Sequence, residues 1–443
     1  MIYFSTAQQV IEESIKKLKS INQDSYFKTR DMAIDYYTFN NTEKYIKKYF
    51  AGTLQDEIPL YPQALTRRLI NRVSMVYKNA PVRMIENDTY EQLTATKDFK
   101  LKTIERTHNL LGTVGVHIGW NGEAFTYNPL INFEPIFYAD NPNEPVAVTY
   151  AVNKTTGSRL YTQEDEFVYW SATEHFKFNQ NGRRYPATDD NPEMINPLGM
   201  IPIVFLQPNT MIDEFWNDNG GDIVIANRQI DIAMTLLQHH MRSSGGQYVA
   251  SGRIDENKVE FGLNKLVVME DGTMSNLNPN TNITSIIDGI KFQLMHIFQN
   301  HHITFDYGIS GNKSGVSLRI ENLELLESRE DDVDKYRMAE NQMYAIEQRF
   351  AEVYGNIALP SDFNIDFAEV EFPLNEQDDE KRWEFWFKHG IKDKADYLIA
   401  KDPDRFVDRE SAQKHLDERM VKTTPEGGTQ NSLIKALQSG NQG

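Results

Sequence analysis

The segment from Gly221 to Gly355 limits the geometry of this chain more than any other part of its sequence. Residues 220–244 have the pattern of an apolar helix, and residues 285–306 have the pattern of a second one. Between them, residues 245–284 contain short β-like runs and an Asp-Gly turn signal. If this insert is compact, the two helices run antiparallel and carry it at one end. Each helix is about 30 Å long at 1.5 Å per residue.

Both helices repeat apolar residues at spacings of three and four, which places these residues on one helical face. They are Ile223, Ala226, Ile230, Ala233 and Leu237 in the first helix, and Ile286, Ile290, Phe292, Met295 and Phe298 in the second. Such a pair is apolar on more faces than one neighbour covers, so we expect it to bury surface against further copies of the chain. The contacts expected between subunits are Ile223, Ile230, Leu237, Ile290 and Phe298.

A glycine-rich loop at residues 307–317 follows the second helix and leads into a long helix at residues 318–355. The three glycines of the loop permit large changes in backbone angles, so we interpret it as a mobile hinge. A Walker A phosphate loop requires Gly-Lys-Ser to be contiguous after a strand. Here Asn312 separates Gly311 from Lys313, and a helix precedes the loop. The pattern therefore does not predict nucleotide binding.

The long helix combines an apolar seam with an acidic first half. The seam consists of Val333, Tyr336, Ala339, Met343, Ile346, Phe350 and Val353. The acids Glu330, Asp331, Asp332 and Asp334 occupy little more than one turn, so their side chains radiate around the axis instead of converging on a metal ion. We expect a solvated or channel-lining acidic helix. The channel-lining candidates are Glu324, Glu327, Asp331 and Asp334.

Net charge and composition exclude several function classes. The 443 residues carry a formal charge of −18, which is unfavourable for tight nonspecific binding to duplex DNA. The absence of cysteine excludes disulfides, thiolate metal sites and a cysteine nucleophile. The N-terminal sequence lacks the apolar core of a signal peptide, and no apolar run reaches membrane-spanning length. We expect a soluble protein, either intracellular or part of a particle.

Residues 24–219 have the pattern of helices followed by an antiparallel sheet. Residues 32–50 and 63–80 have helical periodicity. Residues 112–178 alternate with period two and are cut by Asn-Pro and Asp-Asn turns. A buried strand follows at residues 199–209. This order predicts the α+β fold class.

The remaining segments are shorter. Residues 1–23 form a helical arm in our prediction. Residues 361–373 alternate like an edge strand that rejoins the sheet domain. Residues 374–421 are helical with a break at residues 402–404, and residues 422–443 have the composition of a flexible, disordered tail.

Other residues with chemical potential receive structural interpretations. Tyr36, Tyr37, Tyr45 and Tyr49 are interleaved with Lys44, Lys47 and Lys48, as in a surface that stacks single-stranded nucleic acid. We favour a surface helix with a packed aromatic face. The pairs His239-His240 and His301-His302 point about 100° apart on a helix, so neither predicts a metal site. Asp255 and Glu256, near Lys258, form a weak nuclease-like set, and no Gly-x-Ser-x-Gly motif occurs.

Several segments, in this order, resemble the portal protein, or head–tail connector, of tailed double-stranded DNA phages. They are LINRVSMVYKNAPV, VGVHIGW, FTYNPLINFEPIFYADNPNEPVAVTYA and GMIPIVFLQPN, all before the first apolar helix. The later run GISGNKSGVSLRIENLELLESRED resembles the tunnel loop of that family and the long helix behind it. The resemblance covers roughly residues 30–420, and the order of the parts carries it more than any single motif.

The resemblance implies a ring, usually of twelve subunits, with named parts. These are a wing at 24–219 with a returning strand at 361–373, stem helices at 220–244 and 285–306, a clip at 245–284, a tunnel loop at 307–317, the long helix at 318–355 and a crown at 374–421. The DNA-facing candidates of the tunnel loop are Ile309, Asn312, Lys313 and Val316.

By the same resemblance, the expected function is a non-enzymatic conduit for genome packaging and ejection at one capsid vertex. Its expected partners are the terminase large subunit, a head–tail adaptor at the clip, the major capsid and scaffolding proteins, and double-stranded DNA that passes without tight binding. We expect no cofactor, no catalytic residue and no metal. The location implied is the virion, and the host cytoplasm during assembly. The alternatives are a metal-dependent nuclease that uses the acidic clusters, and another structural or adaptor protein of a virion.

Overall fold

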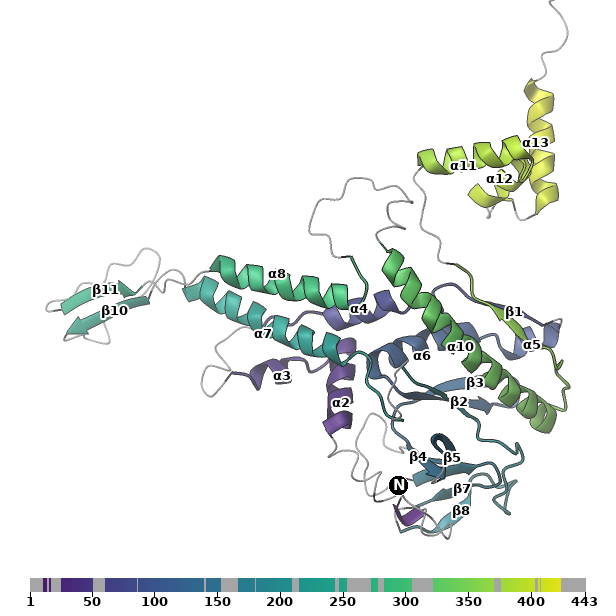
Figure 1. The fold of residues 1–443 in the computed structure, drawn as a ribbon, viewed down its shortest axis with the longest axis horizontal. Coiled ribbons are helices and arrows are strands. Elements are labelled where there is room, and N and C mark those ends of the chain that lie inside the picture. The colour runs from purple at the N-terminus through teal and green to yellow at the C-terminus, as the bar shows by residue number, and fades with distance from the viewer. Residues whose placement is uncertain are drawn as a thin grey trace, which may run out of the picture. The chain divides into compact units, whose positions relative to one another are not determined.

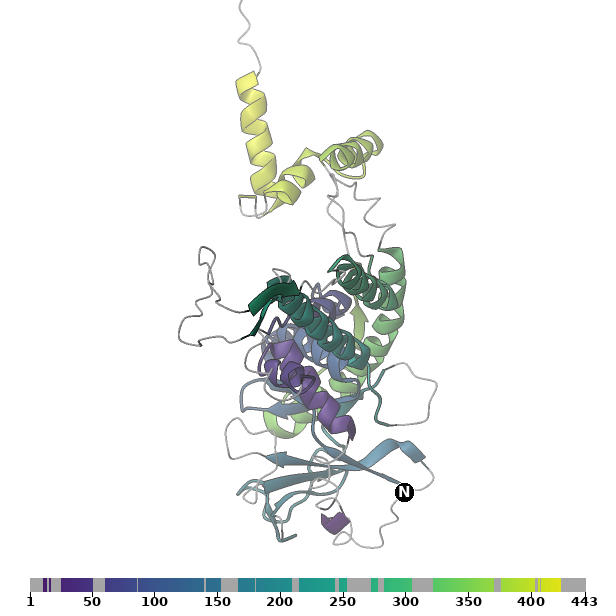
Figure 2. The same ribbon diagram turned by 90° about the vertical axis from the view of Figure 1, so that its left-hand side faces the viewer.

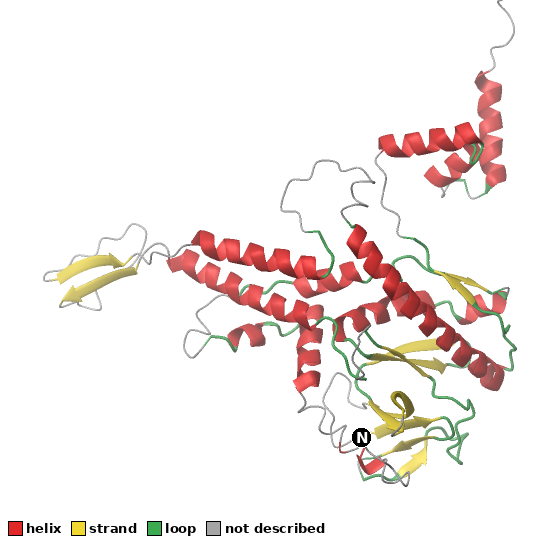
Figure 3. Ribbon diagram, viewed as in Figure 1, coloured by secondary structure: helices red, strands yellow, loops and turns green. Residues whose placement is uncertain are grey.

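The structure, a computed structural model, divides into two compact units. The first contains residues 1–306 and 322–370, and the second contains residues 307–321 and 371–443. The structure describes residues 11–13, 16, 25–50, 60–85, 87–138, 141–152, 166–179, 181–208, 215–243, 247–252, 272–277, 283–304, 322–369, 376–402, 405–406 and 408–423. Helices and strands are both well represented (Figure 3), and the fold class is α+β as predicted. None of the described helices is long and apolar enough to cross a membrane.

The first unit contains a three-stranded and a five-stranded antiparallel sheet. In the smaller sheet, β2 (Val114–Trp120) lies between β3 (Phe125–Leu130) and β9 (Ile203–Leu206). The alternating side chains Val114, Val116 and Ile118 are fully buried, which confirms the period-two pattern. The larger sheet contains five strands in sequence order. They are β4 (Glu134–Tyr138), β5 (Asn141–Val152), β6 (Glu166–Ser171), β7 (His175–Phe178) and β8 (Arg184–Pro186).

The long helix α10 (Leu323–Phe350) covers the smaller sheet with its predicted seam. All seam residues from Val333 to Phe350 are buried and share one core with Val116, Ile118 and Leu206. A π-helical turn, η3 (Ala351–Gly355), ends the helix. Val353 in that turn is more than a third exposed, so the seam stops before it.

Before β2 in the chain, this unit contains the helices α2 (Ser25–Thr38), α3 (Glu43–Lys47), α4 (Leu65–Val73), α5 (Asp88–Leu93) and α6 (Lys97–Leu111). The prediction of one helix over residues 32–50 is wrong. Phe39 and Asn41 adopt left-handed backbone angles, with φ of 57° and 55°, which break it into α2 and α3.

The helix predicted over residues 63–80 is also too long, because α4 ends at Val73. The carboxylate of Glu105 accepts hydrogen bonds from the backbone amides of Val76 and Tyr77, at 2.8 and 3.0 Å. These bonds replace the helical partners of the two amides. The apolar side chain of Val76 is buried, as the periodicity indicates, but it belongs to a turn.

Helices α7 (Gly221–Ser243) and α8 (Ile283–Asn300) form the predicted antiparallel pair. Both views draw them side by side (Figures 1 and 2). Strands β10 (Gln247–Gly252) and β11 (Gly272–Leu277) pair antiparallel where α7 ends and α8 begins. The two described strands of the insert therefore bring its two ends together, as an antiparallel helix pair requires. Helix α8 ends earlier than predicted, and His302 reverses the chain with a φ of 55°.

The strand predicted at residues 361–373 rejoins the sheet domain, because Ile365 and Phe367 share a core with Val116 and Ile118 of β2. Its described part, β12 (Asn364–Asp366), pairs antiparallel with β1 (Val82–Met84), and these two strands form a sheet of their own. Alternation along residues 361–373 indicated a strand correctly but did not identify its partner.

In the second unit, the described residues form three helices, α11 (Glu376–His389), α12 (Lys394–Lys401) and α13 (Arg409–Thr423). Asp393 caps α12 with a reciprocal capping box to Asp396. Ala395, Phe406 and Ala412 form a small core between α12 and α13. The helical prediction for residues 374–421 is confirmed where the structure describes it. The tail predicted at residues 422–443 lies outside the described residues beyond Thr423, and the arm at 1–23 is described only at 11–13 and 16.

Candidate functional site

The four acids predicted on the long helix lie on one exposed face of α10. We call Glu324, Glu327, Asp331 and Asp334 the acidic stripe. Asp334 forms an ion pair with Arg337 at 2.5 Å, and Glu324 lies 3.9 Å from Nδ1 of His302. The stripe occupies the face opposite to the apolar seam, so the core that buries the seam holds the stripe towards solvent.

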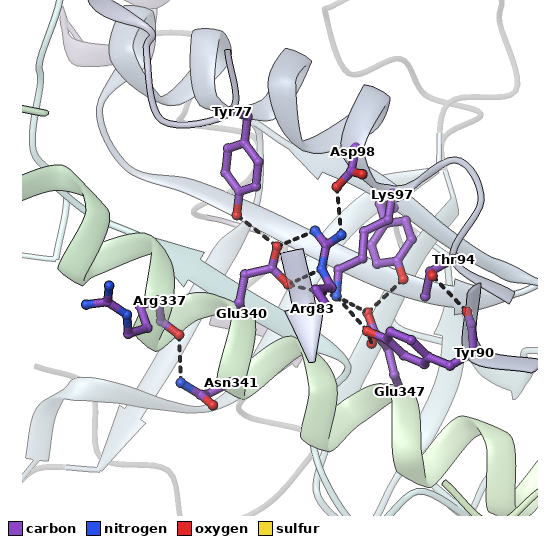
Figure 4. A network of polar contacts seen from close by, with 11 residues as sticks. Tyr77, Arg83, Tyr90, Thr94, Lys97, Asp98, Arg337, Glu340, Asn341 and Glu347 are labelled. Atoms are coloured by element: carbon purple, nitrogen blue, oxygen red, sulfur yellow. Dashed lines mark hydrogen bonds and ion pairs between the residues drawn. The ribbon is translucent and has the colours of Figure 1, made fainter. Parts of the chain in front are cut away.

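The buried face of α10 also carries charge, which the sequence analysis missed. Glu340 and Glu347 are fully buried, and the ammonium of Lys97, itself fully buried, lies between them (Figure 4). The Nζ–Oε distances are 2.9 Å to Glu340 and 2.7 Å to Glu347. Arg83 adds an ion pair to Glu340 at 2.6 Å and another to Asp98 at 2.7 Å. The two glutamates are spaced seven residues apart and interrupt the apolar seam. This interruption is the feature of the sequence that could have indicated buried charge.

Three tyrosine hydroxyls also donate hydrogen bonds to these carboxylates. Tyr77 donates to Glu340 at 3.1 Å, and Tyr90 and Tyr127 each donate to Glu347 at 2.7 Å. Burial alone would raise the pKa of Glu340, but Lys97 and Arg83 outweigh it and lower that pKa to about 2. We call Glu340, Glu347, Lys97, Arg83 and the three tyrosines the α10 anchor. They fix the rotation of α10 about its axis, and with it the direction of the acidic stripe.

A polar cleft of about 280 Å³ opens beside the first turns of α10. Its lining comes from the ends of α4 and α6, the start of α7, the turn after α8 and the acidic half of α10. The lining residues are Val73, Asn109, Pro208, Asn219, Ile223, His301, His302, Leu325, Ser328, Arg329, Asp331, Asp332 and Lys335. Nε2 of His301 lies 2.9 Å from Asp222, which joins the end of α8 to the start of α7. Burial opposes the ionised form of Asp222, yet the bond from His301 leaves its pKa lowered.

Two acids near the cleft pair with cations of the same helix. Asp332 binds Lys335 at 2.8 Å, and Glu330 binds Arg329 at 2.8 Å. Across the described residues, no three His, Asp or Glu side chains come together as a set that could hold a metal ion. His239 and His240 lie near the end of α7, and His301 and His302 follow α8 directly. Asp255, Glu256 and Lys258 lie outside the described residues.

The five residues predicted as contacts between subunits are buried within one chain. Ile223, Ile230, Leu237, Ile290 and Phe298 belong to one core that α7 and α8 share with α2 and α4. They are buried because α2 and α4 cover faces that the periodicity alone left open. The large apolar side chains that α7 and α8 leave exposed are others: Ile225, Met241, Ile287, Phe292 and Met295.

One face of α7 is polar and binds the segment before α4. Asn227, Asp231 and Thr235 are spaced by four residues and fully buried. Asn227 and Asp231 accept hydrogen bonds from the backbone amides of Thr66 and Gln63, both at 2.8 Å. Burial raises the pKa of Asp231 to about 7, although the bonds from Gln63 and Asn227 lower it in part. These residues stabilise the base of the helix pair.

The tyrosines and lysines of residues 32–50 are only partly packed. Tyr36 is fully buried, and Lys44 and Tyr45 both bind the carboxylate of Asp35, at 2.6 and 2.8 Å. The packed aromatic face is confirmed for Tyr36 and Tyr45, whose rings stack, whereas Tyr49 is 59% exposed.

The tunnel-loop candidates Ile309, Asn312, Lys313 and Val316 lie outside the described residues, as does the rest of residues 305–321. Their assignment stays a prediction. No protein-family model matches the chain, and no curated protein matches it.

Proposed function

We propose that this chain is the subunit of a portal ring, the conduit for double-stranded DNA at one vertex of a phage capsid. The observation that carries the proposal is the helix pair α7–α8, which bears a β hairpin at one end and leaves large apolar side chains uncovered. Phe292 on α8 is 58% exposed and Ile225 on α7 is 50% exposed. Side chains of this size on a long helix pair fit contacts with further copies of the chain in a closed ring.

The acidic stripe supports the same proposal. A wall that carries carboxylates repels DNA phosphates, so DNA slides along it without being held. The stripe needs a fixed direction to line a passage, and the α10 anchor supplies it through buried ion pairs on the opposite face. In this proposal the wing, stem, clip, tunnel loop and crown have the residue ranges given above, and Ile309, Asn312, Lys313 and Val316 face the DNA.

The proposal includes partners and location. The clip would dock the terminase large subunit and later the head–tail adaptor, and the wing would contact the capsid and scaffolding proteins. The protein would then reside at the portal vertex of the virion. No observation on the described residues favours the nuclease or another virion component over the ring.

Negative-stain microscopy and native mass spectrometry of the purified chain test this function. We expect closed rings of about a dozen chains. Phe292→Asp should prevent ring formation without unfolding the chain, because it places a charge in the expected contact between copies. Phe99→Asp, at an exposed phenylalanine on α6, is the matched control and should leave rings intact. A stable, folded monomer at micromolar concentration, or magnesium-dependent cleavage of DNA, would overturn the proposal.

A further inference from the structure

One short segment of the second unit is basic, although residues 307–321 and 371–443 together contain 16 Asp or Glu and 14 Lys or Arg residues. Residues 381–394 contain five Lys or Arg residues and only two acids, whereas the whole chain has a net charge of −18. The five cations are all exposed. They are Lys381, Arg382, Lys388, Lys392 and Lys394. A basic segment on an acidic chain localises any attraction for an anionic partner to this surface.

Exposed aromatic side chains lie among these cations. Phe385 is 54% exposed and follows Lys381 by four residues, so the two lie on the same face of α11. Lys388 and His389 continue that face one turn further. The ring centroid of His389 lies 4.3 Å from that of Phe385. Glu384, also exposed, lies three residues after Lys381, so the order along the face is cation, acid and ring, then cation and imidazole.

A second row of cations and rings lies beside the first. The indole of Trp386 is contacted by Arg382, whose Cζ lies 4.8 Å from a ring centroid, and by Lys392, whose Nζ lies 4.3 Å away. Arg382 is oriented by Asp379, at 2.7 Å. The cations thus sit over an aromatic face, where they stay charged and hydrated on their outer side.

Among the described residues of this unit, the aromatic packing between α11 and α12 does not use Phe385. Trp383 is the buried aromatic residue of α11, and its ring meets Tyr397 of α12 at 5.0 Å between centroids. Phe387 also faces Tyr397, at 6.2 Å. Phe385 lies on another side of the helix, where its only aromatic contact among the described residues is His389. Its exposure is therefore not explained by the core of the unit.

We propose that this face of α11 and the turn after it binds single-stranded nucleic acid. Lys381, Lys388 and Lys392 would contact phosphates, and Phe385 would stack on an unpaired base. Alternating cations and exposed rings suit this ligand because phosphates and bases alternate along a single strand. A duplex keeps its bases paired and would meet only the cations. The inference does not depend on the proposed portal function, since it requires neither a ring nor a channel.

Fluorescence anisotropy of the full chain with labelled oligo-dT of about twenty nucleotides tests the inference. We expect binding that weakens with salt, because phosphate contacts release counterions. Phe385→Ala should weaken it about fivefold or more, as loss of one stacked base implies. Lys381→Gln with Lys388→Gln should weaken it and reduce the salt dependence. The matched control is Phe99→Ala with Lys100→Gln, an exposed ring and cation on α6, which should change nothing.

A duplex of the same length and anionic phospholipid vesicles complete the experiment. Absence of binding to oligo-dT at low salt overturns the inference. So does binding that survives both α11 variants, and so does tighter binding to duplex or to vesicles than to the single strand. Ring formation, read by microscopy on the same variants, should be unchanged. The two failures are therefore distinguishable. Microscopy of the unmodified chain shows whether rings assemble, and anisotropy shows whether the single strand binds.

Discussion

At the scale of residues, the most consequential group is the α10 anchor. A buried ion pair costs more in desolvation than an apolar contact of the same volume, so its presence is weak evidence for stability. Removing one partner is different, because it leaves an uncompensated buried charge. Lys97 is the residue whose removal affects both carboxylates, since its ammonium contacts Glu340 and Glu347 at once.

Lys97→Met should therefore lower the free energy of unfolding of the first unit by about 3–5 kcal/mol. Combining it with Glu347→Gln should recover part of this loss, because the double variant no longer buries the unpaired charge of Glu347. Urea denaturation of the single and double variants measures the effect. If the double variant is less stable than Lys97→Met alone, the loss does not come from the unpaired carboxylate of Glu347.

Asp231 makes the stability of the helix-pair base depend on pH. Its pKa is about 7 in the folded chain, above the ordinary value of 3.8, because burial penalises the charged form. The folded state therefore holds this proton more tightly than the unfolded state. The stabilising contribution is complete below about pH 4 and is lost as pH rises through 7.

We expect Asp231→Asn to remove this contribution. Thermal unfolding at pH 5 and pH 8 should show a smaller difference in Tm for the variant than for the unmodified chain. Glu105, whose pKa burial likewise raises to about 7, supplies the comparison. Its titration should persist in the Asp231→Asn variant. An unchanged pH dependence in the variant would show that Asp231 does not titrate in this range.

At the scale of elements, the sequence predicted those helices and strands whose pattern is contained within the element itself. The periodicity of α7, α8 and α10 is contained within each helix, and so is the alternation of β2. The pairing of β1 with β12 joins Arg83 to Ile365, and no local pattern identifies a partner at that distance. The α10 anchor is similarly distant in sequence, because Lys97 and Glu340 come from separate helices.

The same limit applies to the residues predicted as subunit contacts. The apolar face of α7 was correctly identified, but its partner was taken to be another copy of the chain. The structure covers Ile223 and Ile230 with elements from the first hundred residues, notably α2 and α4. Amphipathic periodicity shows which face is buried, not what covers it.

Ile230→Asp should consequently act on folding within one chain. Burying an unpaired carboxylate in a core position of α7 should reduce the free energy of unfolding by several kcal/mol. Ile225→Asp, at a half-exposed position of the same helix, should leave the fold intact. Circular dichroism during thermal unfolding separates the two. Equal Tm values for both variants would mean that the core around Ile230 tolerates the charge.

At the scale of the whole molecule, charge is divided between surfaces. The net charge of −18 is a sum over surfaces that differ in charge. The acidic stripe is presented by a helix that the α10 anchor fixes in the first unit. The basic-aromatic face of α11 belongs to the second unit. A chain with this division repels a duplex at the stripe while it attracts phosphates at α11, so its net charge alone does not predict how it meets nucleic acid.

Reversing the acidic stripe tests this division. Replacing Glu324, Glu327, Asp331 and Asp334 with lysine changes the net charge from −18 to −10. We expect duplex DNA to bind more tightly, with a steeper dependence on salt, because a continuous line of cations neutralises neighbouring phosphates.

A control variant with the same net charge separates the stripe from the total. It replaces four exposed acids elsewhere in the first unit with lysine: Glu91, Glu123, Asp189 and Asp190. Anisotropy titrations with a labelled duplex at two salt concentrations compare the two. A larger gain in duplex affinity for the stripe variant indicates that the position of the lysines matters, because only clustered cations release several counterions together. An equal gain in the control would show that the stripe acts only through the net charge, and its assignment as the wall of a DNA passage would then fail.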